Sequence, residues 1–307
     1  MHIAVLCATQ RGLRFVERLH ALAPDAHLTV FSFREQANEP PFIDAIHYAS
    51  EAMGGTFYEA RQAASVAHFW DETPPDLLFM ISWRYLVPAS VYGRARLGAF
   101  VFHDSLLPAY RGFSPTVWAM INGEDHTGVS LFEVADGVDS GPIIAQRRVP
   151  ISLDDTIAEV LPRVTEAYLD VLTEQLPALL AGTAPRTPQD QTQATYTCRR
   201  LPEDNRIDWS APSECIYNLI RATTAPYAGA HTTSAGRKLT VWAAERLPDF
   251  PPYAGRVPGR VVEVQPGDGS IVLTGDGAIL LTDVQPEGES PVNAAEFLTS
   301  LSHTLGR

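Results

Sequence analysis

The chain has little of what marks nucleic-acid-binding and membrane proteins. Its 307 residues include a single lysine, Lys238, and carry a formal net charge of −13. A protein that neutralises many phosphates needs a basic patch or stripe, so this charge disfavours a nucleic-acid partner. No run approaches the roughly 20 apolar residues that a membrane helix needs, so we expect no membrane partner either.

Cysteines are equally sparse. The three, Cys7, Cys198 and Cys215, lack the spacing of a metal or redox site, so we expect incidental thiols and no metal. The chain starts with MHIAVLCATQ, which has no basic start and no cleavage site of a signal peptide, and which is typical of a buried strand. These features favour a reducing, cytoplasmic location.

The first half of the chain alternates strand and helix patterns. Strands are expected at 2–7, 27–33, 76–83, 98–103, 128–134 and 142–150, and helices at 12–22, 59–69, 89–95, 115–122 and 154–181, with a polar connection at 34–55. This alternation predicts an α/β fold with a Rossmann-like, mostly parallel sheet and helices on both faces. The turn after the first strand, ATQRG, lacks the glycine-rich fingerprint of a dinucleotide site.

The pattern changes after about residue 185. Residues 186–205 are rich in Thr, Pro, Gln and Arg, which is typical of a linker. After a helix at 212–223, short alternating runs separated by glycine-containing turns predict a small antiparallel domain. We therefore expect a Rossmann-like catalytic domain at 1–185, the linker, and a C-terminal OB-like β-barrel domain at 206–307.

Two loops offer groups for proton transfer. His103 begins the loop HDSLLPAYRG where a strand ends, and the loop ADGVDSG brings Asp136 and Asp139 between glycines. Open sheets bind ligands beyond the carboxyl ends of their strands, which places the first loop at a predicted ligand edge. A histidine facing a carboxylate is the usual arrangement for proton transfer near neutral pH.

These motifs carry a family resemblance. FHDSLLPAYRG, followed by TGVSLFEVADGVDSGPIIAQ, resembles the formyltransferase family that uses N10-formyltetrahydrofolate. The family includes methionyl-tRNA, glycinamide ribonucleotide and amino-sugar formyltransferases, and residues 194–242 are similar to the C-terminal domain of its amino-sugar and tRNA branches. The resemblance implies a formyl donor, N10-formyltetrahydrofolate, and catalytic roles for His103 and Asp139.

Val101 departs from the family motif. The family has an asparagine there, whose amide is thought to donate a hydrogen bond to the developing oxyanion, and valine has no donor. Three explanations stay open. Another donor such as Ser105, a loop N–H or His103 itself replaces the amide; or the chain hydrolyses 10-formyltetrahydrofolate; or it is a non-catalytic folate-binding module.

The resemblance also implies binding residues for the folate, and the place of other residues in the sequence suggests contacts for the acceptor. It places the folate against an apolar wall with polar groups, which we assign to Trp83, Tyr85, Leu86, Val87, Val134, Asp136 and Val138. Candidate acceptor contacts are Ser105, Arg111, Arg221 and Tyr227, with Arg111 able to meet a phosphate.

The expected acceptor is a small amine. The segment where tRNA enzymes insert basic residues is acidic here, EQANEPPFIDAIHYASE, which disfavours tRNA. Glycinamide ribonucleotide enzymes typically have one domain, whereas this chain continues. An amino-sugar nucleotide or an amino-acid-derived amine is therefore expected, and a homodimer is one assembly to consider.

Overall fold

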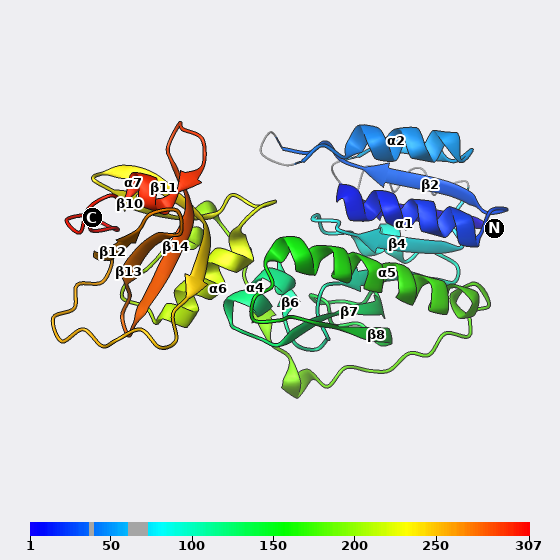
Figure 1. Ribbon diagram of the computed structural model, residues 1–307. Helices are drawn as coiled ribbons and strands as arrows, with labels where there is room; N and C mark the ends of the chain where they lie inside the picture. The colour runs from blue at the N-terminus through cyan, green and yellow to red at the C-terminus, as the bar shows by residue number, and fades with distance from the viewer. Residues whose placement is uncertain (37–39, 61–72) are drawn as a thin grey trace. The chain divides into compact units, whose positions relative to one another are not determined.

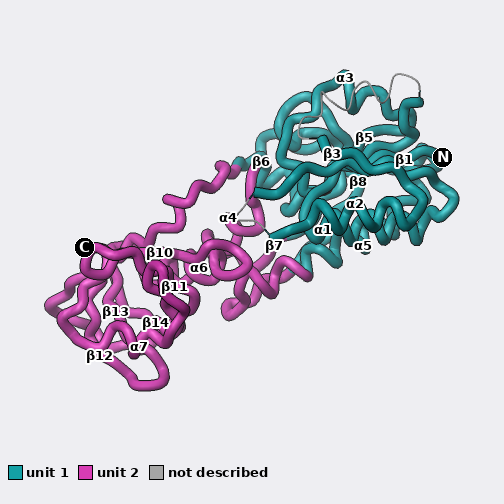
Figure 2. The backbone as a smooth tube through the Cα atoms, turned by 90° about the horizontal axis from the view of Figure 1, so that it is seen from above, with its two compact units in different colours: residues 1–112, 128–149, 163–196 teal, residues 113–127, 150–162, 197–307 magenta. Residues whose placement is uncertain are grey.

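The protein forms two compact units. The computed structural model describes residues 1–36, 40–60 and 73–307 (Figure 1). Unit 1 comprises residues 1–112, 128–149 and 163–196, and unit 2 comprises residues 113–127, 150–162 and 197–307 (Figure 2). The two units interleave along the chain, and the domain boundaries expected from sequence stay a prediction.

Unit 1 contains a seven-stranded sheet. In order across the sheet the strands are β3 (Thr56–Glu59), β2 (His27–Ser32), β1 (His2–Cys7), β4 (Leu77–Ile81), β5 (Gly98–His103), β7 (His126–Glu133) and β8 (Ile143–Pro150). The pairs from β3 to β5 are parallel, and β5 pairs with β7 in antiparallel register. The predicted α/β fold with a mostly parallel sheet is confirmed.

Helices cover both faces of this sheet. The helices with residues in unit 1 are α1 (Thr9–Leu22), α2 (Ile43–Ala52), α3 (Ala89–Tyr92) and α5 (Ile157–Leu180). On one face, Phe15 of α1 makes edge contacts with Phe79 and Phe102, and Tyr168 of α5 stacks on Phe102. On the other face, Val91 of α3 packs among the alternate strand residues. Successive residues along each strand therefore face opposite sides of the sheet and contact different helices.

Helix α2 corrects the expected polar connection at 34–55. Its buried residues Ile43, Ile46 and Ser50 are spaced by three and four, but the helix is short and only two of these buried residues are large and apolar. The structure has β3 at Thr56–Glu59, and the rest of the helix expected at 59–69 falls mostly outside the described residues.

Unit 2 contains a six-stranded antiparallel sheet. Its path is β10 (Ala230–Ser234), β11 (Arg237–Arg246), β14 (Ala278–Pro286), β13 (Gly269–Leu273) and β12 (Val261–Gln265), with β15 (Val292–Asn293) paired to β14. The helices α4 (Pro115–Ile121), α6 (Ser213–Thr223) and α7 (Ala294–Phe297) also belong to this unit. Ile216 and Ile220 of α6 pack with Leu239, Val241 and Leu281 in its core. The predicted antiparallel sheet is present, and β10 and β15 are additional strands.

Short elements complete the chain. β6 (Arg111–Gly112) pairs with β9 (Tyr196–Thr197), and the 3-10 turns η3 (Gln191–Gln193) and η4 (Pro202–Asn205) follow α5. Within the described ranges, no helix combines the length and the apolar character needed to cross a membrane.

Candidate functional site

His103 is the last residue of β5, and its imidazole is held by its own loop. The side chain is buried, with the residue 8% exposed. Its Nε2 atom lies 2.8 Å from the carbonyl oxygen of Tyr110. Because a carbonyl can only accept, Nε2 carries a proton in this arrangement, and Nδ1 is the nitrogen left for chemistry.

Asp139 faces that second nitrogen. Its Oδ2 atom lies 3.7 Å from Nδ1 of His103 and accepts a hydrogen bond of 2.8 Å from the backbone N–H of Gly112. The backbone of Asp139 is left-handed, with φ of +46°, and Tyr110 is left-handed as well, with φ of +59°. Such conformations cost about 1–3 kcal/mol each and gather at functional sites. Two loops distant in sequence therefore meet at His103.

Most of the other donors of the His103 loop are used inside the protein. The hydroxyl of Ser105 donates to the carbonyl oxygen of Ala109 at 2.6 Å. The backbone N–H groups of Leu107, Tyr110 and Arg111 donate to Ser130 Oγ, Thr195 Oγ1 and the Thr195 carbonyl oxygen, respectively. The hydroxyl proton of Ser105, which the sequence suggested as a replacement oxyanion donor, is thus directed away from the reacting centre.

Val101 belongs to an apolar wall next to His103. The two residues are separated by one position on β5, so their side chains leave the same face of the sheet. Val101 packs against the same buried cluster as Trp83, Val87 and Val134, three residues assigned to folate binding. The valine thus extends the wall on which these three residues lie.

The remaining residues of the expected folate site are exposed. Leu86 is 92% exposed, which rules out a core position, and Tyr85 and Val138 also reach solvent. Asp136 accepts a hydrogen bond of 3.1 Å from the hydroxyl of Tyr92. These side chains are accessible to a ligand, and their folate contacts stay a prediction.

The wall holds one buried polar atom suited to a heterocycle. The indole Nε1 of Trp83 is buried and has no hydrogen-bond partner in the part of the chain that the structure describes. A buried donor without a partner costs about 1–3 kcal/mol. The residues present have the chemistry that a flat polar ring needs, an apolar wall and an unpaired donor, and a ring that uses this donor must displace the protein atoms that now cover it.

Arg111 does not lie where a substrate phosphate would meet it. The residue is 1% exposed, and its guanidinium donates to Gln189 Oε1 at 2.6 and 3.2 Å, to Gln191 Oε1 at 2.8 Å and to the Tyr196 hydroxyl at 3.2 Å. The expected contact between Arg111 and a phosphate is therefore not supported. In this structure the guanidinium makes buried hydrogen bonds within the protein.

The sequence reasoning did not single out Gln189. It stands in the segment expected to be a linker, and its environment is made by residues from three distant parts of the chain. The Pro-Gln-Asp composition around it is typical of a turn-rich connection, so no local signal marks the residue.

The two acceptor residues expected in the C-terminal part belong to unit 2. Arg221 is buried there and donates to Asn218 Oδ1 at 2.8 Å and to the carbonyl oxygens of Ser152 and Asp155 at 3.0 and 2.9 Å. Burial lowers the pKa of this guanidinium. These contacts give Arg221 a structural position, whereas Tyr227 is exposed and available to a ligand.

Asp104, next to His103, points to the opposite face of the sheet. Both of its carboxylate oxygens lie 2.7 Å from Nη1 of Arg11, and the hydroxyl of Tyr168 donates to Oδ1. Burial raises the pKa of this carboxyl group, but Arg11 and the hydrogen bond from Tyr168 outweigh that effect, so the pKa is lowered overall. The group anchors the end of β5 to α1 and α5.

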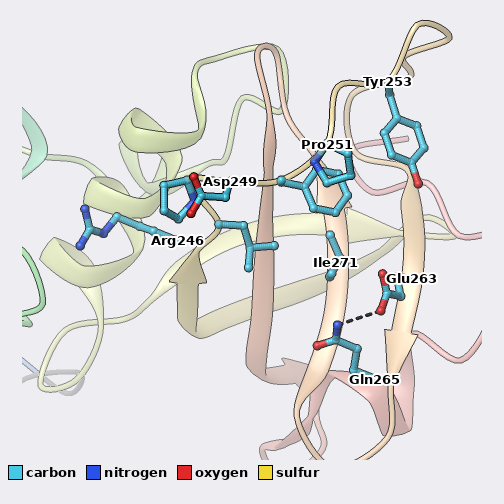
Figure 3. Close-up of a pocket in the computed structure, with 10 residues that line it drawn as sticks. Arg246, Asp249, Pro251, Tyr253, Glu263, Gln265 and Ile271 are labelled. Carbon is cyan, nitrogen blue, oxygen red and sulfur yellow. Dashed lines mark hydrogen bonds between the residues drawn. The ribbon is translucent and has the colours of Figure 1, made fainter.

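A separate hollow in unit 2 lacks the candidate catalytic residues. Its volume is about 480 Å³, and Figure 3 shows its lining, with Gln265 donating to Glu263 at 2.8 Å. Phe250 and Tyr253 stack beside it with ring centroids 5.6 Å apart. The hollow contains neither a histidine nor a histidine–carboxylate pair, which separates it from the His103 site.

Family models match both parts of the chain. The model described as formyl transferase matches residues 18–176, which is more than half of the chain. The model described as formyl transferase, C-terminal domain, matches residues 201–302. The chain belongs to the formyl transferase family. The family predicted from the sequence motifs is therefore confirmed.

Solved structures share the fold at low sequence identity. An N-formyltransferase from Helicobacter canadensis, in complex with folinic acid and dTDP-3-aminofucose, is 17% identical with a TM-score of 0.72, over 92% of this chain and 98% of its own. Methionyl-tRNA formyltransferase from Clostridium thermocellum is 19% identical with a TM-score of 0.57, over 81% and 95%. HypX from Aquifex aeolicus, in complex with tetrahydrofolic acid, is 19% identical with a TM-score of 0.63, over 96% of this chain and 46% of its own. The chain thus spans about half the length of HypX.

Proposed function

We propose that this formyl transferase moves a formyl group from N10-formyltetrahydrofolate to the amine of a small acceptor. The observation that carries the proposal is the convergence of His103 Nδ1 and Asp139 Oδ2, 3.7 Å apart, at the carboxyl edge of the sheet. Solved relatives with this fold hold folinic acid or tetrahydrofolic acid, which supports the donor class.

Asp139 is the group that receives the acceptor's proton in this proposal. The amine attacks the formyl carbon, the new amide C–N bond forms, and the bond from that carbon to N10 breaks. The amine loses one proton overall, and N10 of the leaving tetrahydrofolate gains one. A carboxylate fixed by the Gly112 N–H and directed at the reacting centre is placed to accept that proton and to pass it on.

His103 supplies the oxyanion donor that Val101 lacks. Nε2 donates to the Tyr110 carbonyl, so a second proton on Nδ1 gives an imidazolium whose free N–H faces the site. The Ser105 hydroxyl and the N–H groups of Leu107, Tyr110, Arg111 and Gly112 already have acceptors, which leaves His103 the best-placed donor among these groups. One oxyanion donor contributes about 2.7–4 kcal/mol to transition-state stabilisation.

The donor lies, in this proposal, against Trp83, Val87, Val101 and Val134. The Trp83 indole N–H would bind a polar edge of the pterin ring, and the aliphatic side chains would exclude water from the formyl group. Exclusion of water favours an amine acceptor over hydrolysis. An amino-sugar nucleotide is the first acceptor class to test, because an N-formyltransferase with this fold is in complex with dTDP-3-aminofucose, and amino-acid-derived amines are the second.

The test is release of tetrahydrofolate from N10-formyltetrahydrofolate with and without a panel of amino-sugar nucleotides and amino acids. Release that depends on one acceptor is expected, with His103→Ala and Asp139→Asn each lowering the rate at least about 100-fold. Equal release without any acceptor would instead indicate a hydrolase. Donor binding without release under any condition would contradict a catalytic role.

A further inference from the structure

Gln189 is a buried amide between the two catalytic loops. It lies after α5, in the segment that composition assigns to a linker, yet the residue is only 8% exposed. Nearby, Thr187 and Ile143 exchange two backbone hydrogen bonds of 2.8 Å, which fixes this segment beside β8. Gln189 is therefore part of the ordered interior of unit 1.

The hydrogen bonds of Gln189 run in two directions. Its Oε1 atom accepts from Arg111, with distances of 2.6 Å to Nη2 and 3.2 Å to Nε. Its Nε2 atom donates to the carbonyl oxygens of Gly141 at 2.6 Å and Asp139 at 2.9 Å. A primary amide has two donor hydrogens and an oxygen with two lone pairs, so the side chain uses its full capacity.

Asp139 is consequently held at both ends. The N–H of Gly112 fixes its carboxylate, and the amide of Gln189 fixes its main-chain carbonyl. Arg111, adjacent to Gly112, in turn holds the oxygen of Gln189. These contacts stabilise the left-handed backbone at Asp139, a conformation that aspartate adopts more readily than most residues but less readily than glycine.

We propose that Gln189 is a positioning residue that sets the Asp139 carboxylate against Nδ1 of His103. The inference rests on the proposed formyl transfer, in which these two groups handle the amine proton and the oxyanion. Gln189 touches neither substrate in this view. It acts by keeping the Asp139 loop in the one backbone conformation that gives the separation of 3.7 Å.

Two variants remove the support while a third and a fourth serve as controls. Gln189→Glu keeps an acceptor for Arg111 but loses both N–H donors to the Asp139 loop, and Gln189→Met loses all four bonds without adding charge. Gln191 also accepts from Arg111, at 2.8 Å, and no hydrogen bond joins it to Asp139 in the described structure. Gln191→Glu and Gln191→Met therefore disturb the Arg111 side of the network and the contact of 3.3 Å from Gln191 Nε2 to the Gln189 carbonyl oxygen, but they remove no hydrogen bond to Asp139.

The kinetic readout separates rate from binding. We expect both Gln189 variants to lower kcat by about 10- to 100-fold, because displacing a reacting group by about 1 Å costs up to that much. KM for N10-formyltetrahydrofolate should change less than about threefold, and the Gln191 variants should keep kcat within about threefold of the unmodified chain. Equal losses at Gln189 and Gln191, or a kcat unchanged in both Gln189 variants, would overturn the proposal.

A second readout needs no turnover. The Cε1–H resonance of His103, identified by its absence in His103→Gln, reports the nearby carboxylate. In both Gln189 variants it should move towards its position in Asp139→Asn, and in both Gln191 variants it should stay. An unmoved resonance in folded Gln189 variants would refute the positioning role. A chain that transfers no formyl group would refute the proposed function alone, since the resonance still decides the role of Gln189.

Discussion

Asp104→Asn is expected to destabilise unit 1 by about 3 kcal/mol at neutral pH. Both carboxylate oxygens of Asp104 lie 2.7 Å from Arg11 Nη1, and the Arg11 and Asp104 side chains are only 11% and 19% exposed. Removing one partner of a buried ion pair costs about 3–5 kcal/mol. Asparagine keeps an acceptor oxygen for the Tyr168 hydroxyl, so the loss should fall at the lower end of that range.

The loss should depend on pH in a defined direction. Burial raises the pKa of Asp104, but Arg11 and the Tyr168 hydrogen bond lower it further than burial raises it, so the folded-state pKa lies below the ordinary value. A carboxylate of this kind stabilises the fold above its unfolded pKa of about 3.9 and loses that contribution as pH falls through the lower folded value. The difference in free energy of unfolding between Asp104→Asn and the unmodified chain should therefore have its largest value at about pH 7 and become smaller below about pH 4.

Hydrogen exchange of the β1 amides measures this quantity for unit 1 without assuming that both units unfold together. The matched control is Glu166→Gln, which breaks the ion pair of Glu166 with Arg14, another link from α5 to α1 with side chains 53% and 37% exposed. That pair should contribute less than about 1 kcal/mol. A loss for Asp104→Asn no larger than the control, or a loss that persists unchanged at about pH 3, would refute the reasoning.

Three further outcomes follow from the site and the thiols. Burial raises the pKa of the Cys7 thiol, whereas Cys198 and Cys215 are exposed. A thiol reagent should therefore modify Cys198 and Cys215 in the native protein and Cys7 only on unfolding. Rapid modification of all three cysteines in the native protein would contradict the burial of β1. Ser105→Ala should change kcat less than about threefold, because its hydroxyl proton is directed to the Ala109 carbonyl, and a loss of about 100-fold in steady-state assays would restore it as an oxyanion donor. Val101→Asn should leave kcat unchanged or lower it, since the amide would enter the apolar wall, and a tenfold gain would show that a missing donor limits the reaction.

The strands β1 and β5 were predictable because they are continuous, mostly apolar runs with side chains buried on both faces of the sheet. β1 and β5 occupy the residues that the sequence indicated. Helix α2 was missed because its buried positions are few and follow Pro40 and Pro41, which are typical of a connection. The local sequence pattern was therefore sufficient where burial is continuous, and it failed at a short amphipathic helix that buries only three residues.

In the candidate site, too, some features were predictable from the sequence and others were not. The motif spacing pointed to His103 and Asp139, and the structure brings their side chains together, while their catalytic role stays a prediction. Arg111 was assigned to a phosphate because arginine near a loop suggests one, but its burial depends on Gln189, 78 residues away. A local sequence pattern does not predict a contact between residues so far apart in the chain, because the complete fold of unit 1 brings them together.

Isotopically labelled formyl donor gives the most direct test of formyl transfer by His103 and Asp139. The chain is incubated with N10-formyltetrahydrofolate labelled in the formyl carbon and with the acceptor panel, and the label is then located by mass spectrometry. Label should appear in the amide of one acceptor, and His103→Ala and Asp139→Asn should abolish it. Label found only in formate, or transferred at an unchanged rate by either variant, would contradict the account.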